Sequence, residues 1–262
     1  MFFGEMDNES KDKVAVKLYN RKLFKYAIRE DRAIKRMHAD KTAAHSFFVV
    51  NKRYTNGQTS DRMVFMDQYP FTLANWAWQN PPISVLKLQL HMLVRGVAYC
   101  HAKGIAHRDI KTNNVMIGYD LVPKLIDFGL SSIEGEPFER HDGGTRLYKA
   151  PEILMNTMMQ TLKGAKRTDC WSLGITIYRA IYNDMPFGCW ELGWKEYFKE
   201  KKVPAIEVSD LELAFIKKDK KLPKDYQLAN DLIRGLLEVD VNKRKTAAES
   251  INHPFFKEWN YS

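Results

Sequence analysis

The first part of the chain has the pattern of β-strands. Short apolar runs at Val14–Tyr19, Phe47–Tyr54 and Met63–Met66 predict three strands, and a polar turn with a glycine joins the last two. Between the first two runs, Leu23–His38 has the composition of a charged helix. We therefore expect residues 1–69 to form a small strand-rich unit with one helix.

The rest of the chain is mainly helical in pattern. Trp171–Tyr182 and Leu228–Leu237 are apolar segments that we expect to be helices. A third helix is expected near Ser84, a plausible N-cap. Its apolar positions recur at helical spacing at Leu86, Leu90, Leu93 and Val97. The two parts predict an α+β fold with a helical body at residues 70–262, a hinge near Asp67–Thr72 and a ligand-binding cleft between them.

The composition indicates a folded globular chain. Of 262 residues, 45% are apolar, enough for a large core, and 28% are charged. The net charge of +9, from 41 basic and 32 acidic residues, permits acidic partners such as nucleic acid. The sequence has no recognised nucleic-acid-binding motif, so the charge alone specifies no partner.

The cysteines and the apolar runs bear on the compartment. Cys100, Cys170 and Cys189 lie far apart, without the spacing of a disulfide framework or a zinc site. The sequence has no apolar run of membrane-spanning length, and its first residues do not have the pattern of a signal peptide. We therefore expect an intracellular protein, cytoplasmic or nuclear, with no membrane partner.

Three short motifs lie between residues 107 and 152: HRDIKTNNVMI, LIDFG and GGTRLYKAPE. Each alone has an ordinary explanation, such as a turn with a salt bridge between Arg108 and Asp109. Their order and spacing are more specific. Asn114 follows Asp109 by 5 residues, and Asp127 follows it by 18. Glu152 lies 25 residues beyond Asp127.

Upstream of these motifs, Lys17 ends an apolar run, where a lysine is costly to bury unless an anion meets it. With Glu30 on the following helix, the whole set resembles the eukaryotic-type protein kinases, from about Phe2 to Phe256. The resemblance implies a two-lobed α+β fold, with a truncated small β-rich N-lobe at 1–69 and a mainly helical C-lobe at 70–262. It also implies transfer of the γ-phosphate of ATP to a protein substrate.

The resemblance implies that ATP and Mg²⁺ are the cofactors. Lys17 would meet the α- and β-phosphates, and Glu30 would hold Lys17 in place. Asp127 would bind the Mg²⁺ that bridges the phosphates, and Asn114 would hold a second ion. Both side chains offer the oxygen ligands that Mg²⁺ prefers.

The resemblance also implies which residues act on the acceptor. Asp109 would orient the substrate hydroxyl and accept its proton, and Lys111 would reach the γ-phosphate. Thr145 would bridge Asp109 and Lys111. Lys111 and Thr145 are typical of kinases that act on serine and threonine rather than tyrosine.

The same resemblance implies an adenine site. Met66 would lie at the back of the pocket, while the main chain of Asp67 and Tyr69 would face the adenine edge. Ala15 and Met116 would lie above and below the ring. Taken singly, each of these residues could instead be an ordinary core residue.

Further matches are structural. Asp169 is expected to open the central helix and anchor the catalytic loop, and Glu152 is expected to pair with Arg244. A stacked spine is expected from Ile34, His107 and Phe128, with His107 a packed residue rather than an acid or base.

One family feature is missing from the sequence. Kinases of this family place a glycine-rich loop ahead of the lysine strand, whereas Gly4 is the only glycine before Lys17, and Met1–Met6 resembles the second strand. Either the protein is natively short or its true start lies upstream. Without the loop we expect weaker ATP binding, because backbone N–H contacts to phosphate are lost. The alternative function is a kinase-like decoy or regulator that binds another kinase or its substrate. A decoy needs no catalytic groups, so catalysis is favoured by the joint presence of Lys17, Glu30, Asp109, Asn114 and Asp127.

Activation by phosphorylation is not expected. Arg108 precedes the catalytic aspartate, but His141 occupies the usual phosphothreonine position, and no Ser, Thr or Tyr lies between Ser132 and Thr145. We expect Glu139 or Asp142 to pair with Arg108. A solvated acidic loop is the alternative.

The expected substrate groove carries positive charge. Arg179 lies ten residues after Asp169, where kinases that prefer basic substrates place a glutamate, and Asn113 is neutral where they place another. Arg146 and Lys149 lie in the adjoining segment. These charges predict a preference for acidic or already phosphorylated sequences around the target. Alternatively, Arg179 only pairs with a neighbouring acid.

Overall fold

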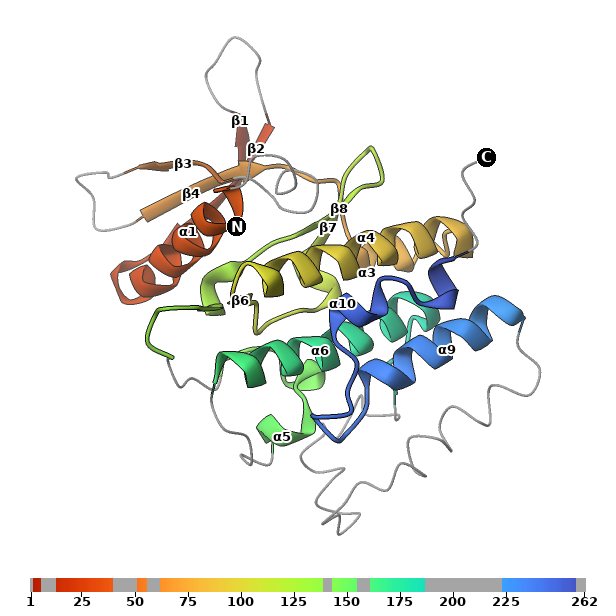
Figure 1. Ribbon diagram of the computed structural model, residues 1–262. Coiled ribbons are helices and arrows are strands. Elements are labelled where there is room, and N and C mark those ends of the chain that lie inside the picture. The colour runs from red at the N-terminus through yellow and green to blue at the C-terminus, as the bar shows by residue number, and fades with distance from the viewer. Residues whose placement is uncertain are drawn as a thin grey trace.

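The computed structural model describes residues 2–5, 13–39, 51–55, 62–138, 143–154, 161–186 and 223–257. Within them, a small sheet with one helix stands beside a larger helical part (Figure 1). This arrangement confirms the expected α+β fold. The sheet is antiparallel, with the order β1-β2-β4-β3. Its strands are β1 (Phe2–Glu5), β2 (Lys13–Tyr19), β3 (Asn51–Thr55) and β4 (Arg62–Asp67).

The strands agree with the sequence pattern where they can be compared. β2 and β4 match the expected strands to within one residue. β3 covers the end of the expected strand at Phe47–Tyr54, and residues 47–50 lie outside the described residues. Because side chains alternate along a strand, Ala15, Lys17 and Tyr19 share one face of β2, and Ala15 and Tyr19 are buried. Lys17 therefore points toward the interior of the molecule.

Helix α1 (Phe24–His38) contacts two apolar clusters. Ala27 packs in the small cluster under the sheet with Ala15, Tyr19, Val64 and Met66. Ala33, Ile34 and Met37 belong to the large cluster of the helical part. α1 therefore lies between the sheet and the helices (Figure 1), where its position affects both sides of the site.

The helical part is built around two long helices, α4 (Ile83–Ala102) and α6 (Leu162–Tyr182), which share the large apolar cluster. Two small sheets complete it, with the orders β5-β7-β8 and β6-β9. None of the helices in the described ranges is long and apolar enough to span a bilayer. The remaining elements are β5 (Phe71–Thr72), α3 (Leu73–Ala77), β6 (Ile105–Ala106), β7 (Val115–Ile117), β8 (Pro123–Leu125), β9 (Ser132–Ile133), α5 (Pro151–Leu154), α9 (Lys224–Leu236) and α10 (Ala247–Ser250).

Two expected helix starts are wrong. Ser84 is not an N-cap, because α4 begins one residue earlier, at Ile83, with Pro82 in the cap position. Asp169 does not open the central helix. α6 begins at Leu162, where the Thr161 side chain accepts a hydrogen bond from the Gly164 amide. The polar residues that follow hide the apolar periodicity of this first part of α6.

Candidate active site

Lys17 joins the sheet to the helical part through two carboxylates. Its Nζ lies 2.6 Å from Asp127 Oδ1 and 3.3 Å from Glu30 Oε2. Glu30 lies on α1 and is buried, while Asp127 lies two residues after the end of β8. The anions that meet the lysine are therefore two side chains of the chain itself, which are 13 and 110 residues away in sequence.

Tyr19 is a member of this cluster that the sequence reasoning missed. Its hydroxyl donates a 2.6 Å hydrogen bond to Glu30 Oε2, the same oxygen that Lys17 contacts. The signal was present in the sequence, because Tyr19 lies two residues after Lys17 and so occupies the same face of β2. The buried carboxylate of Glu30 is thereby held by a hydroxyl as well as by an ammonium.

The cluster shifts the pKa values of its members. Burial alone would lower the pKa of Lys17, but Glu30 and Asp127 raise it above 10.5. Burial alone would raise the pKa of Asp127, but Lys17 and its hydrogen bond hold it below 3.8. Both groups are therefore charged at neutral pH.

A second cluster surrounds Asp109 in the loop after β6. Lys111 Nζ lies 2.8 Å from Asp109 Oδ2 and also donates to Thr145 Oγ1, at 2.7 Å. The Thr145 amide and hydroxyl both donate to Asp109 Oδ1, at 2.9 and 2.8 Å. Asn114 Nδ2 donates to Asp109 Oδ2 at 3.0 Å. The expected bridge of Thr145 between Asp109 and Lys111 is present.

Gly144 brings Thr145 this close to the loop. Its φ is +95°, which side chains disfavour, and a Cβ there would lie 2.8 Å from the Arg108 carbonyl oxygen. Any other residue would push the segment that carries Thr145 away from Asp109.

The backbone of the Asp109 loop is anchored from below. Asp169 accepts hydrogen bonds from the amides of His107 and Arg108, both at 2.7 Å, as expected. The buried ring of His107 packs edge-on against Phe128, with ring centroids 4.6 Å apart. Its Nδ1 accepts from the Asp109 amide and its Nε2 faces the Ile126 carbonyl at 2.9 Å. Both ring nitrogens are used, which confirms His107 as a packed histidine.

The two clusters meet at one end of the β7–β8 hairpin. Val115 pairs with Leu125, and the Ile126 amide donates to the Asn114 carbonyl at 2.9 Å, so Asn114 and Asp127 leave the hairpin together. Because Asn114 Nδ2 bonds Asp109, its Oδ1 is the atom that can face a cation. The described residues contain no group of three or more His, Cys, Asp and Glu suited to a metal. One carboxylate and one amide oxygen instead suit Mg²⁺ that is shared with phosphates.

Comparison with known proteins agrees with this geometry. The profile of the protein kinase domain matches residues 3–256. The chain belongs to the protein kinase family.

Similar proteins include serine/threonine kinases of two organisms. Over 175 residues the chain is 33% identical to the probable serine/threonine-protein kinase fhkB of Dictyostelium discoideum. The matched region covers 63% of this chain and 14% of that protein. Over 181 residues it is 35% identical to fhkE of the same organism, with 65% and 23% covered. Over 179 residues it is 31% identical to the serine/threonine-protein kinase RAD53 of Saccharomyces cerevisiae, with 63% and 20% covered. The chain thus spans less than a quarter of the length of these relatives.

The kinase chain also brings most of the expected adenine-site residues to one region. Ala15 and Met66 are buried cross-strand partners on β2 and β4. Asp67 ends β4, and Tyr69 follows on the connection to the helical part. Burial, with Asp67 and Asp120 nearby, raises the pKa of Tyr69 to about 12. Met116 lies on β7, half-buried.

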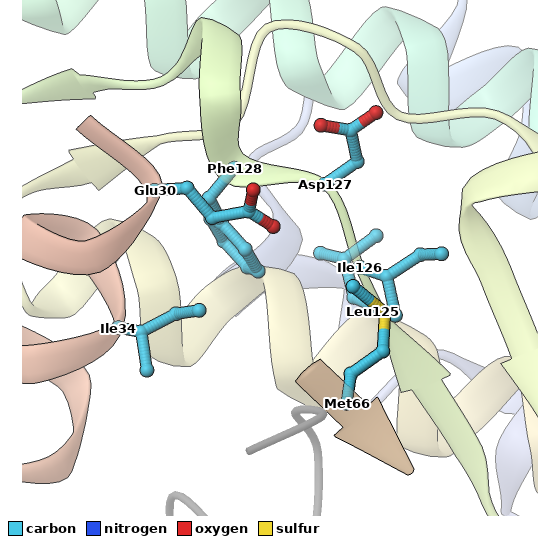
Figure 2. Close-up of a pocket in the computed structure, with 7 residues that line it drawn as sticks. All are labelled: Glu30, Ile34, Met66, Leu125, Ile126, Asp127 and Phe128. Carbon is cyan, nitrogen blue, oxygen red and sulfur yellow. The ribbon is translucent and has the colours of Figure 1, made fainter. Parts of the chain in front are cut away.

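Met66 lines a small pocket. Figure 2 shows Ile34 on one side of it and Met66 with Leu125 on the other. The carboxylates of Glu30 and Asp127 are the charged groups in its lining. The pocket therefore joins the expected adenine region to the Lys17 cluster. Its full lining is Glu30, Ile34, Met66, Leu125, Ile126, Asp127 and Phe128.

The base of the kinase helical part holds the expected buried ion pair. Arg244 Nη1 and Nη2 lie 2.7 and 2.9 Å from the two carboxylate oxygens of Glu152. The Arg244 side chain is fully buried, and its guanidinium also lies over the Trp171 ring. This pair fixes the end of the segment that carries Thr145.

The segment near Arg108 is described only in part. Arg108 Nη1 donates to Ser132 Oγ at 3.1 Å, and its guanidinium lies 4.8 Å from the Phe138 ring centroid. Glu139, His141 and Asp142 lie outside the described residues, so the expected carboxylate partner of Arg108 stays a prediction.

Arg179 is linked to the catalytic loop through Tyr148. Its Nη1 donates to the Tyr148 hydroxyl at 2.9 Å, and that hydroxyl lies 2.9 Å from Thr112 Oγ1. Arg146 begins the short 3₁₀ turn that Tyr148 ends. Arg146, Tyr148 and Arg179 therefore lie near one another and near the loop of Asp109.

Proposed function

We propose that this chain is a protein serine/threonine kinase that transfers the γ-phosphate of ATP to a protein hydroxyl. The observation that carries the proposal is the meeting of two charged clusters at one end of the β7–β8 hairpin. One holds Lys17, Glu30 and Asp127, and the other is centred on Asp109. Phosphoryl transfer needs such groups on both sides of the phosphate.

The proposed roles follow from the contacts. Lys17 binds the α- and β-phosphates, and Glu30 with Tyr19 fixes the direction of its ammonium. Asp127 and the Oδ1 of Asn114 would hold Mg²⁺, which supplies positive charge to the phosphate oxygens when bound. Ala15, Met66 and Met116 enclose the adenine, and the backbone of Asp67 and Tyr69 faces its edge. These residues lie on β2, β4, β7 and the connection after β4.

The four hydrogen bonds to Asp109 imply how the acceptor enters. Each carboxylate oxygen already accepts two hydrogen bonds, so the substrate hydroxyl can bind only if one donor leaves. Lys111 has an alternative partner in the γ-phosphate. When ATP is bound, its amine turns to the phosphate, and Asp109 Oδ2 accepts the hydroxyl of the substrate.

The direct test is incubation of the chain with labelled ATP, Mg²⁺ and a generic acceptor protein, followed by phosphoamino-acid analysis. We expect label on serine and threonine, and none with Asp109→Ala. Label on tyrosine alone would contradict the proposed class. Because ATP and protein substrates of kinases are abundant inside cells, we also propose a cytoplasmic or nuclear location.

The proposed substrate is acidic or already phosphorylated near its target residue. Arg179 is held beside the catalytic loop by its hydrogen bond to Tyr148, and Arg146 lies in the same short turn as Tyr148. Positive charges that face one groove attract an acidic peptide and repel a basic one.

A peptide array with acidic, neutral and basic residues around a central serine tests the preference. We expect the wild type to favour acidic peptides and Arg179→Glu to lose that selection. Lys163→Glu is the matched control, because Lys163 is an exposed residue in the first turn of the same helix and undergoes the same charge reversal. Selection of basic peptides by the wild type would contradict the proposal.

A further inference from the structure

Arg36 connects α1 to two distant segments of the chain. Its Nε donates to the Lys103 carbonyl at 2.6 Å, and its Nη1 donates to the Glu134 carbonyl at 3.0 Å. These partners lie 67 and 98 residues away in sequence. Lys103 follows α4, and Glu134 follows β9, in the segment that begins at Asp127. One guanidinium thus ties the end of α1 to both sides of the β6–β9 pair.

The two carbonyls that accept from Arg36 lie just outside the ends of the paired strands β6 and β9. The Glu134 amide donates to the Gly104 carbonyl at 2.8 Å, and Ile105 pairs with Ile133. The two carbonyls that accept from Arg36 therefore belong to one connected unit. The guanidinium of Arg36 suits this pair of acceptors, because its Nε and Nη1 donors are held apart in a fixed planar fork.

The bonds to carbonyls, not the nearby ion pair, carry the connection. Arg36 Nη2 lies 3.5 Å from Glu134 Oε2, with side chains 40% and 63% exposed. A pair this exposed contributes little. The two backbone carbonyls are fixed acceptors, so they set the position of the arginine.

Two more arginines on the same stripe of α1 contact the same segment. Arg29 Nη1 donates to the Gly129 carbonyl at 3.3 Å, and Arg32 Nη1 lies 3.4 Å from Glu136 Oε2. Arg29, Arg32 and Arg36 are spaced three and four residues apart, which places them on one side of a helix. Figure 1 shows α1 beside the region of β6, the strand with which β9 of this segment pairs. Glu30 follows Arg29 directly, so the position of this stripe sets the position of Glu30.

We propose that Arg36 is a positioning residue that holds α1 where Glu30 meets Lys17. The proposal rests on the proposed function, because it concerns how the same site binds ATP. Without Arg36, α1 spends less time in this position, and Lys17 is less often directed at the phosphates. When only a fraction of molecules is competent, apparent affinity falls by that fraction, while bound ATP selects the competent form.

Arg36→Gln tests the proposal through a split between kinetic constants. We expect KM for ATP to rise about fivefold to tenfold, with kcat at saturating ATP within about twofold of wild type. The dissociation constant of a fluorescent ATP analogue with Mg²⁺ is expected to rise by the same factor. Arg36→Lys is expected to behave like Arg36→Gln, because its single nitrogen does not place donors at the separate positions of Nε and Nη1.

The matched control is Lys35→Gln, the neighbouring basic residue. Its side chain is 75% exposed and pairs with Asp31 one turn away. We expect this variant to match wild type in both constants. A loss of kcat at unchanged KM in Arg36→Gln would show only damaged structure and would overturn the proposal, as would unchanged constants.

A nucleotide-independent measurement separates this proposal from the proposed function. Hydrogen–deuterium exchange of residues 24–38 should be faster in Arg36→Gln than in wild type, with α6 unchanged. If wild type transfers no phosphate but the variant shows weaker analogue binding or faster exchange in α1, the proposal of kinase activity is wrong and the positioning role of Arg36 holds. Wild-type exchange together with wild-type affinity overturns the positioning role.

Discussion

Lys17 Nζ lies 2.6 Å from Asp127 Oδ1, although 110 residues separate them in the sequence. The contact joins β2 of the small sheet to the end of the β7–β8 hairpin in the helical part. Lys17 also lies 3.3 Å from Glu30 on α1. The ammonium of Lys17 on β2 therefore contacts both α1 and the residue that follows the β7–β8 hairpin by two positions.

Lys17→Met should remove phosphate transfer while the fold is kept. Loss of one preorganised positive group at a phosphate costs about 10²-fold to 10³-fold in rate. Glu30 keeps its hydrogen bond from Tyr19, and Asp127 is partly exposed, so neither carboxylate is left buried without a partner or water. Initial rates and circular dichroism check both points. Lys22→Met, at an exposed lysine just before α1, should transfer phosphate at the wild-type rate.

Tyr19→Phe should weaken the site without removing a charge. The Tyr19 side chain is buried and bonds the Glu30 carboxylate, so the variant should lose about 1 to 3 kcal/mol of stability. We also expect kcat/KM for ATP to fall several-fold, because Glu30 holds Lys17 less firmly. Urea unfolding and steady-state kinetics measure the two effects. Tyr119→Phe, at a tyrosine 89% exposed, is the control, and an equal effect there would argue against this account.

The stabilisation by the Lys17 cluster should depend on pH only at the extremes. Asp127 has a lowered pKa, so its contribution is present above 3.8 and is lost as the pH falls through its folded value below that. Lys17 has a raised pKa, so its contribution is full below 10.5 and is lost as the pH rises through its folded value above that. The difference in unfolding free energy between wild type and Lys17→Met should thus be constant from about pH 5 to pH 9 and shrink under stronger acid. Urea titrations across this range check it, and a step near pH 7 would contradict the assignment.

Arg244→Met should destabilise the helical part strongly. Arg244 is fully buried and bonds both oxygens of Glu152, so removal of the arginine leaves a buried carboxylate uncompensated. The expected cost is about 3–5 kcal/mol. Lys243→Met, at the exposed neighbour, should change stability by less than about 0.5 kcal/mol. Similar losses in both variants would mean that the pair contributes little.

The sequence was sufficient to predict the groups that lie in short motifs. Asp109, Lys111 and Thr145 meet as the family resemblance implied. Asp109 and Lys111 are two residues apart, and Gly144 permits Thr145 to approach them from 36 and 34 residues along the chain. Asp169 bonds the loop backbone as expected. Local patterns of this kind retain their meaning wherever the chain places them.

Contacts that depend on long-range packing were harder to foresee. Arg36 has the pattern of an ordinary exposed helix arginine, and nothing near it in sequence indicates that Lys103 and Glu134 are its partners. The start of α6 was missed because its first turns are polar on the outside and are stabilised by the Thr161 cap. Tyr19 could have been found by extending the alternation of β2 by one more step.

The most direct measurement compares phosphate transfer by wild type, Asp127→Asn and Asp231→Asn. Labelled ATP, Mg²⁺ and one acceptor protein are used at equal enzyme concentrations. Asp127→Asn keeps the size of the side chain but removes the charge that meets Lys17 and Mg²⁺, whereas Asp231 is 65% exposed and bonds only His253 among the contacts described here. The account predicts transfer to serine and threonine by wild type and Asp231→Asn, and a loss of at least about 10²-fold in Asp127→Asn. Equal transfer by Asp127→Asn and wild type, or none above background by wild type, would contradict it.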